Sequence, residues 1–302
     1  MRNFLLACVV FLICGVTTSY AAERTAIIFP DVREPYRTIF RDIVTGVKNS
    51  SAVTPLIYSF DENWRAEELR AWVSTNQITN LVVLGNQALN LAHAGNLTDV
   101  RITAGAITNW PNHVAVNGVA YLPAPSALFK ELTRYANTVR RVHVIYESSV
   151  NAWQVEIAQR EIERLGFSLQ VYKVASLQEA AKTYSNLLSG INPKTDAIWL
   201  PLDDQSLDSR VILPMILKES WNRAIVVFSS NPAHVSRGVL FSLYPDSRYL
   251  GQQLVPLSQA TTASVLPADK LKKAFNIRTA EHLNINITDA ELKKIDILFP
   301  AR

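Results

Sequence analysis

Short runs of β-branched and aliphatic residues alternate along this chain with longer segments whose apolar residues recur at helical spacing. The run 26–29 is followed by the segment 36–47, in which Ile39, Phe40 and Ile43 fall on one face. Strands separated by helices of this length predict right-handed β-α-β units and therefore parallel sheets. In this first series the predicted strands are 26–29, 55–58, 81–84 and 101–104.

The same alternation then restarts, which predicts a second sheet. Two prolines in Leu122-Pro123-Ala124-Pro125 restrict the backbone at the point where the second series begins. Two successive series predict an α/β chain made of two doubly wound parallel-sheet lobes joined by a hinge. The strands expected in the second series are 140–146, 168–174, 196–200 and 224–228, with helices over 152–165, 177–188 and 206–219.

The first residues have the pattern of a secretory signal peptide. Arg2 precedes an unbroken apolar stretch over 4–16, and Ser19 and Ala21 occupy the small-residue positions of a cleavage site. The stretch is shorter than the roughly 20 residues that a spanning helix needs, which disfavours the alternative of a membrane anchor. We therefore expect a signal peptide over 1–21, cleaved after Ala21, and a mature chain in the periplasm.

Both cysteines, Cys8 and Cys14, lie inside that leader. The mature chain would then contain no disulfide and no cysteine metal site, which agrees with a bacterial periplasm. Lipid attachment stays open but disfavoured, because Ile13 precedes Cys14 and only seven residues precede Cys8. The formal charge of +4 is small. It gives no reason to expect a nucleic-acid partner, although a basic surface would help to capture an anion.

Polar side chains follow many of the predicted strands. In open parallel sheets, ligands bind beyond the carboxyl ends of the strands, and two such lobes that face each other form a cleft that closes by hinge motion. Short polar side chains in these loops would either meet a ligand or cap the next helix. The candidate ligand-binding residues are Tyr36, Asn86, Gln87, Tyr146, Glu147, Ser148, Asp203, Asp204, Ser229, Ser230 and Tyr244.

Two segments of the second half, 195–204 and 225–230, resemble the substrate-binding components of ABC transporters. The resemblance is strongest to the branch that includes tryptophan- and tyrosine-binding members. The segments 249–253 and 275–287 are similar to the closing pattern of that family. The resemblance implies a type I periplasmic-binding fold with lobe one over 22–122 plus 239–302 and lobe two over 123–238.

The resemblance also implies roles for three residues. Asp203 would meet a ligand ammonium group, Tyr146 would stack on an apolar ligand, and Asn86 would bind a carboxylate at a helix start. Each has a structural alternative, since Asp203 and Asn86 would also serve as helix caps and Tyr146 as a core residue. The chain departs from the family pattern at 147–149 and 241–245, so the ligand need not be an aromatic amino acid.

The family implies a monomer that delivers a small organic ligand to an ABC permease. A sensor that signals to a membrane receptor would use the same clamp, so the sequence does not separate import from sensing. A periplasmic hydrolase is the alternative of a different class, but the chain has no nucleophile elbow, zinc-protease motif, P-loop or dinucleotide fingerprint. The five histidines are far apart in sequence and lack the spacing of metal ligands. We therefore expect no catalysis, no metal and no cofactor.

Overall fold

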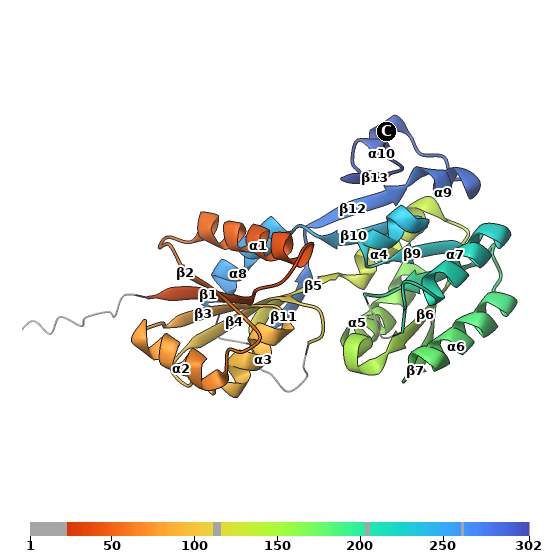
Figure 1. The fold of residues 1–302 in the computed structure, drawn as a ribbon. Helices are drawn as coiled ribbons and strands as arrows, with labels where there is room; N and C mark the ends of the chain where they lie inside the picture. Colours follow the sequence, from red (N-terminus) through yellow and green to blue (C-terminus); the bar gives the residue numbers. More distant parts are fainter. Residues whose placement is uncertain (1–22, 111–115, 203–205, 261–262, 302) are drawn as a thin grey trace, which may run out of the picture.

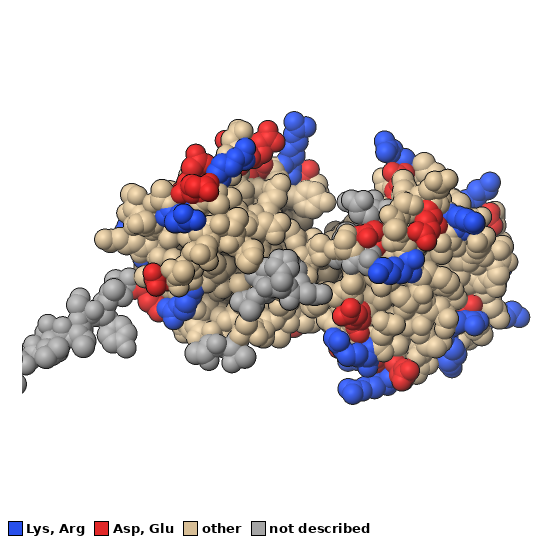
Figure 2. Space-filling view, turned by 90° about the horizontal axis from the view of Figure 1, so that it is seen from below, with Lys and Arg blue, Asp and Glu red and all other residues tan. Residues whose placement is uncertain are grey.

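The computed structural model describes residues 23–110, 116–202, 206–260 and 263–301. They form two α/β bodies that lie side by side (Figure 1). A space-filling view shows a narrow waist between the two bodies, and on the face in view the charged side chains of both signs are intermixed (Figure 2). Among the described residues, no helix is both long enough and apolar enough to cross a membrane.

The first body contains a six-stranded, fully parallel sheet in the order β11-β5-β4-β3-β1-β2. Helices cover both of its faces, with α2 and α3 packed on one side and α1 and α8 on the other. The strands are β1 (Thr25–Pro30), β2 (Leu56–Phe60), β3 (Asn80–Leu84), β4 (Arg101–Ile107), β5 (Asn117–Pro123) and β11 (Val265–Ala268). The helices are α1 (Tyr36–Ser50), α2 (Ala66–Thr75), α3 (Asn86–Ala94) and α8 (Ser247–Leu257).

The second body contains a seven-stranded sheet in the order β13-β12-β10-β9-β8-β6-β7. Only the β10–β12 pair is antiparallel. The strands are β6 (Arg141–Glu147), β7 (Ser168–Val174), β8 (Asp196–Leu200), β9 (Val226–Ser229), β10 (Phe241–Pro245), β12 (Leu271–Asn276) and β13 (Ile297–Phe299). The helices are α4 (Pro125–Tyr135), α5 (Ser148–Glu161), α6 (Leu177–Gly190), α7 (Ile212–Arg223), α9 (Ile277–His282) and α10 (Asp289–Leu292), with 3₁₀ turns η1 (Ile162–Leu165) and η2 (Pro232–Arg237).

The predicted α/β class with two mostly parallel sheets is confirmed. The apolar face predicted for the first helix is the buried face of α1. Helix α7 begins later than expected, so Pro214 falls in its first turn. A proline is tolerated there because the first N–H groups of a helix have no intrahelical partner.

Helices α1 and α8 pack backbone against backbone. A Cβ atom at Gly46 would collide with the carbonyl oxygen of Arg248, and one at Gly251 would collide with that of Ile43. Glycine at both positions therefore allows this close approach. The contact joins a C-terminal helix to the first body, although the two segments are far apart in sequence.

The chain passes three times between the two bodies. It leaves the first sheet after Pro123, returns between Pro245 and Ser247, and leaves again between Ala268 and Leu271. The backbone N–H of Asp246 donates to the carbonyl of Lys270 at 3.0 Å, which ties two of these crossovers together.

The assignment of 239–302 to the first lobe is wrong for most of that segment. Strand β10 pairs with β9 on one side and with β12 on the other, and β13 pairs with β12. These three strands therefore extend the second sheet, and only α8 and β11 of this segment belong to the first body.

Candidate functional site

The carboxyl ends of the strands in the first sheet, and of β6 to β10 in the second, point toward the crossovers between the two bodies, whereas β12 and β13 run the other way. Strand β5 ends at Pro123, where the chain crosses to the second body, and the side-chain Nε2 of Gln154 on α5 donates to the Pro123 carbonyl at 3.2 Å. The indole of Trp153, also on α5, packs against the apolar cluster of the first body that includes Ile107 and Trp110. Helix α5 follows the carboxyl end of β6, so its first turns bridge the two bodies.

On the first body, Asn86 organises the loop after β4. Its side-chain oxygen accepts hydrogen bonds from the backbone N–H and the hydroxyl of Thr108, both at 3.1 Å, and its amide nitrogen donates to the carbonyl of Asn109. The backbone turns into α3 at Gly85, whose φ of 85° falls in the region that favours glycine. Asn86 thus lies at the predicted position, but its amide holds the neighbouring loop.

The end of β4 departs from regular strand geometry. Ala106 has a φ of 57°, and the pairing of β4 with β5 shifts register between Gly105 and Ile107. A bulge with a left-handed non-glycine residue is costly and is found disproportionately at sheet rims and functional sites. Here it lies at the carboxyl edge, two residues before Thr108.

On the second body, two buried amides on α5 have unsatisfied oxygens. Asn151 and Gln154 are each 1% exposed, and within the described part of the chain Asn151 Oδ1 and Gln154 Oε1 have no hydrogen-bond partner. The amide nitrogen of Asn151 donates to the carbonyl of Leu202 at 3.4 Å, as that of Gln154 does to Pro123. Because each nitrogen points to a carbonyl, the free atom is in both cases an acceptor. A buried acceptor without a donor costs about 1–3 kcal/mol, so two of them three residues apart need an explanation.

Three predicted residues lie where β6 ends and α5 begins. The carboxylate of Glu147 caps the helix by accepting the backbone N–H of Ser149 at 3.0 Å. Tyr146 is half-buried against the core of the second body, and burial raises the pKa of its phenol, with Glu156 adding to the shift. The backbone of Ser148 begins α5. Asp203, Asp204 and the side chain of Ser148 lie outside the described residues.

The two predicted serines after β9 are turned into the protein. Ser229 Oγ donates to the carbonyl of Leu200 at 3.1 Å and lies 2.9 Å from His234 Nδ1, and Ser230 Oγ accepts from the indole N–H of Trp199 at 3.1 Å. Both serines are buried. Their polar atoms are therefore used within the second body.

The remaining predicted residues are spread around the crossovers. Tyr36 and Gln87 are exposed at the starts of α1 and α3. Tyr244 on β10 is half-buried, and burial together with Asp296 raises its pKa to about 12. A related tyrosine that the sequence did not suggest, Tyr121 on β5, lies 3.0 Å from Ser247 Oγ beside the second crossover, and burial raises its pKa.

Sequence reasoning missed Asn151, Trp153 and Gln154 because they fall within a helix and not in a loop. Their signal was present in the pattern. Asn151 and Gln154 lie three residues apart on the face that Val155 and Ala158 bury, so the helical period places two amides among core positions. Among the described residues, no cluster of three or more His, Cys, Asp or Glu side chains could hold a metal ion.

No known protein family and no curated protein matches the sequence. Solved structures do match it. An ABC domain in complex with L-Trp from Streptococcus pneumoniae superposes with a TM-score of 0.61 at 20% identity, covering 92% of this chain and 100% of that chain. A ligand-free, open substrate-binding protein with adhesive properties from Clostridium difficile gives a TM-score of 0.67 at 14% identity, with coverage of 92% and 100%.

This is the type I periplasmic-binding fold. A periplasmic ribose ABC transporter protein from Conexibacter woesei shares it, with a TM-score of 0.51 at 14% identity over 87% of this chain and 93% of that chain. LacI-family transcriptional regulators share it as well, with TM-scores of 0.51. These neighbours are binding proteins and regulators, and at such identities the likeness shows the type I periplasmic-binding fold alone.

Proposed function

We propose that this protein is an exported solute-binding protein that captures a small organic molecule between its two lobes for an ABC importer. The expected signal peptide over 1–21 supports a periplasmic location. The substrate-binding proteins among its structural neighbours support solute capture, and the L-Trp complex among them supports an amino-acid-like ligand. Transcriptional regulators share the fold, but the expected signal peptide and the small net charge give no support for a DNA-binding role in this chain.

The observation that carries the proposal is the pair of unpartnered oxygens on Asn151 and Gln154 beside the Pro123 crossover. Acceptors that lack a donor within the protein are suited to a ligand that brings N–H or O–H groups. An ammonium group supplies several such donors and forms charge-assisted bonds. Both oxygens are covered in this conformation, so binding requires the lobes to move, as a hinge of three crossovers permits.

Trp153 adds an apolar surface to the same site. It belongs to the second lobe but packs on the first, so its contacts must change when the lobes move. A flat apolar group on the ligand would replace part of that packing. The ligand class that fits is therefore a small amphipathic molecule with a donor group at one end. Asp203, Asp204 and Tyr146 remain proposed contacts at the same edge.

A thermal-shift screen of the mature chain against amino acids, amines and small acids tests this function. A ligand that binds only the folded state raises the melting temperature with the logarithm of its concentration. We expect a hit among donor-bearing amphipathic molecules, and we expect Asn151→Leu and Gln154→Leu each to remove most of the ligand-induced shift.

The matched control is Gln159→Leu, which makes a similar change on the exposed side of the same helix. It should leave the shift intact. A hit whose shift survives in both Asn151→Leu and Gln154→Leu would place the binding site elsewhere.

A further inference from the structure

A groove lies at the opposite edge of the second sheet from the candidate site. It consists of adjoining cavities of about 260 and 540 Å³. We call it the Trp221 groove, after the residue at its centre. The residues that matter below are Trp221, Arg237, Gly238, Arg278, Thr279 and His282.

The position of the groove separates it from the cleft between the lobes. Ile225 and Val227, at the amino end of β9, line the groove, whereas Ser229 ends the same strand at the carboxyl edge. Gly238 precedes the amino end of β10. A ligand in the groove would therefore contact only the second lobe, far from the crossovers.

The aromatic part of the groove is held rigidly. The indole of Trp221 is 41% exposed, and the imidazole of His282 stacks on it with ring centroids 3.8 Å apart and planes at 6°. His282 Nε2 also donates to the carbonyl of Trp221 at 2.7 Å, which fixes the imidazole in place. The exposed part of the indole is thus held in place, so contact with a ligand would cost little further side-chain entropy.

The charged part of the groove is not neutralised by the described residues. Neither Arg237 nor Arg278 takes part in any of the ion pairs that these residues form. The guanidinium of Arg278 lies 5.7 Å from the centre of the Trp221 ring. Arg237 is exposed, and its charge adds to burial in lowering the pKa of the nearby His234.

The floor of the groove offers a ligand few other polar atoms. The hydroxyl of Thr279 already donates to the carbonyl of Gly238 at 2.9 Å, and the amide of Asn276 donates to the carbonyl of Val235 at 2.8 Å. The guanidinium groups of Arg237 and Arg278, together with the ammonium group of Lys218, are therefore the main charged donors among the described residues that line the groove. Guanidinium forks match carboxylate and phosphate oxygens, and the combined volume is that of ordinary small-molecule sites.

We propose that the Trp221 groove is a second ligand site for a small organic anion. Its carboxylate or phosphate would lie on Arg237 and Arg278, and its flat apolar body would lie against Trp221. The proposal is independent of solute capture between the lobes, because no residue is shared between the two sites.

Calorimetric titration of the mature chain tests the groove with three probes: 1-naphthoate, AMP and inorganic phosphate. The first two carry a carboxylate or a phosphate on a flat ring system, so their comparison distinguishes the two kinds of anion. We expect at least one of them to saturate at one molecule per chain, about tenfold or more tighter than inorganic phosphate. Added salt should weaken the binding.

The double substitution Arg237→Ala with Arg278→Ala should weaken that binding about tenfold or more, and Trp221→Ala should weaken it as well. Arg160→Ala removes an exposed arginine of the same lobe outside the groove and should have no effect. Thermal melts should show that the double arginine variant stays folded, since both side chains are exposed. The proposal is overturned if neither 1-naphthoate nor AMP reaches saturation, or if the double variant binds them as tightly as the native chain does. It is also overturned if inorganic phosphate binds as tightly as the ring-bearing anions.

The outcome of the groove experiment does not affect the proposal for the interlobe site. The double arginine variant should lose binding in the groove, but the interlobe ligand should still raise its melting temperature as much as in the native chain. Failure of the groove proposal would in turn not affect the behaviour of Asn151→Leu.

Discussion

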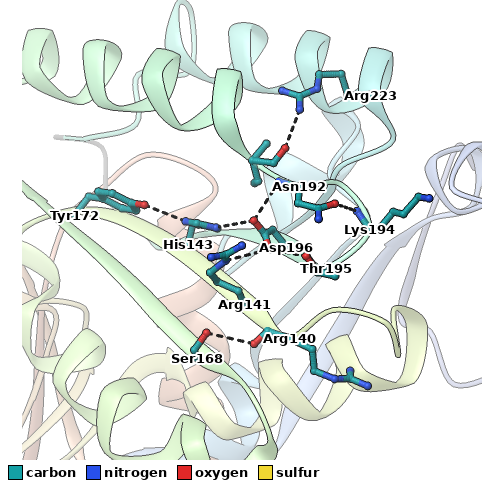
Figure 3. Close-up of polar contacts among 11 residues, drawn as sticks. Arg140, Arg141, His143, Ser168, Tyr172, Asn192, Lys194, Thr195, Asp196 and Arg223 are labelled. Atoms are coloured by element: carbon teal, nitrogen blue, oxygen red, sulfur yellow. Dashed lines mark hydrogen bonds and ion pairs between the residues drawn. The ribbon is translucent and has the colours of Figure 1, made fainter.

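Two polar clusters in the second lobe, at opposite edges of its sheet, are built in opposite ways. At the amino edge, Asp196 is surrounded by donors: Arg141 Nε and Thr195 Oγ1 on one oxygen, and His143 Nε2 and the N–H of Asn192 on the other, at 3.0–3.3 Å (Figure 3). At the carboxyl edge, the side-chain oxygens of Asn151 and Gln154 accept no hydrogen bond from any residue that the structure describes. Both clusters are buried.

The difference separates polar groups that hold the fold from polar groups that are available to a ligand. Burial alone acts to raise the pKa of Asp196, but the hydrogen bonds from Asn192, Arg141, Thr195 and His143 outweigh it and hold that pKa below its ordinary value. The carboxylate is thus fully satisfied within the protein and has no reason to bind a solute. An unsatisfied amide pair lowers the stability of the ligand-free protein. A ligand whose donors bond to these oxygens removes that cost, which favours binding.

Among the tests of this comparison, Asp196→Ala should have the largest effect. It would leave His143 and the Asn192 N–H without their acceptor in a buried site, and we expect a loss of about 3 kcal/mol in the free energy of unfolding. Urea denaturation measures it. Asp99→Ala, at an exposed carboxylate, should cost much less. A loss below about 1 kcal/mol for Asp196→Ala would contradict the structural role given to this cluster.

The second test uses pH. Burial, with the charge of Arg237, lowers the pKa of His234 to about 4, whereas an unfolded histidine has a pKa of about 6.5. The unfolded chain therefore binds a proton that the folded chain rejects, so stability is complete above about pH 6.5 and falls as pH falls toward 4. The loss from this residue amounts to about 3 kcal/mol at the acid end.

Thermal melts between pH 7 and 4 measure that loss, and His234→Gln should flatten the profile. Burial also lowers the pKa of His143, so part of the acid sensitivity should remain in the variant. An identical pH profile in the native chain and in His234→Gln would show that His234 titrates normally.

The smallest effect is expected at the interlobe site of the ligand-free protein. Asn151→Leu removes an unsatisfied oxygen and a long hydrogen bond, so the stability of the ligand-free protein should stay within about 1 kcal/mol of native or rise. Urea denaturation checks this, with Gln159→Leu as the reference on the exposed face. A loss above about 2 kcal/mol would indicate that Asn151 belongs with the structural cluster instead.

The alternation of strand and helix was enough to predict two sheets, because the hydrophobic pattern of each β-α-β unit lies within a short stretch of sequence. The allocation of the C-terminal segment was not predictable in this way. Strands β11 and β13 are short. Strand β10 joins the second sheet beside β9, and β12 then joins through an antiparallel pairing with β10 across the intervening α8 and β11. Periodicity carries no information about which sheet a strand joins.

The loops that follow the strands were predictable from the sequence, but the directions of their side chains were not. The carboxyl edges do face each other, but Ser229 and Ser230 turn inward and Asn86 braces a loop. Side-chain direction in loops depends on tertiary hydrogen bonds, which a loop sequence does not specify. The Trp221 groove was beyond prediction, since its residues come from α7, η2 and α9.

The three passages between the bodies mean that neither half is one continuous stretch of polypeptide. A single protease cut at Pro123, at Asp246 or at Lys270 would leave the halves tethered by two uncut spans. Only severing every span would release them, and each released half would then be an assembly of fragments. Expression of either half alone would require the chain to be reconnected, and a genetic fusion at the natural termini would leave the spans intact.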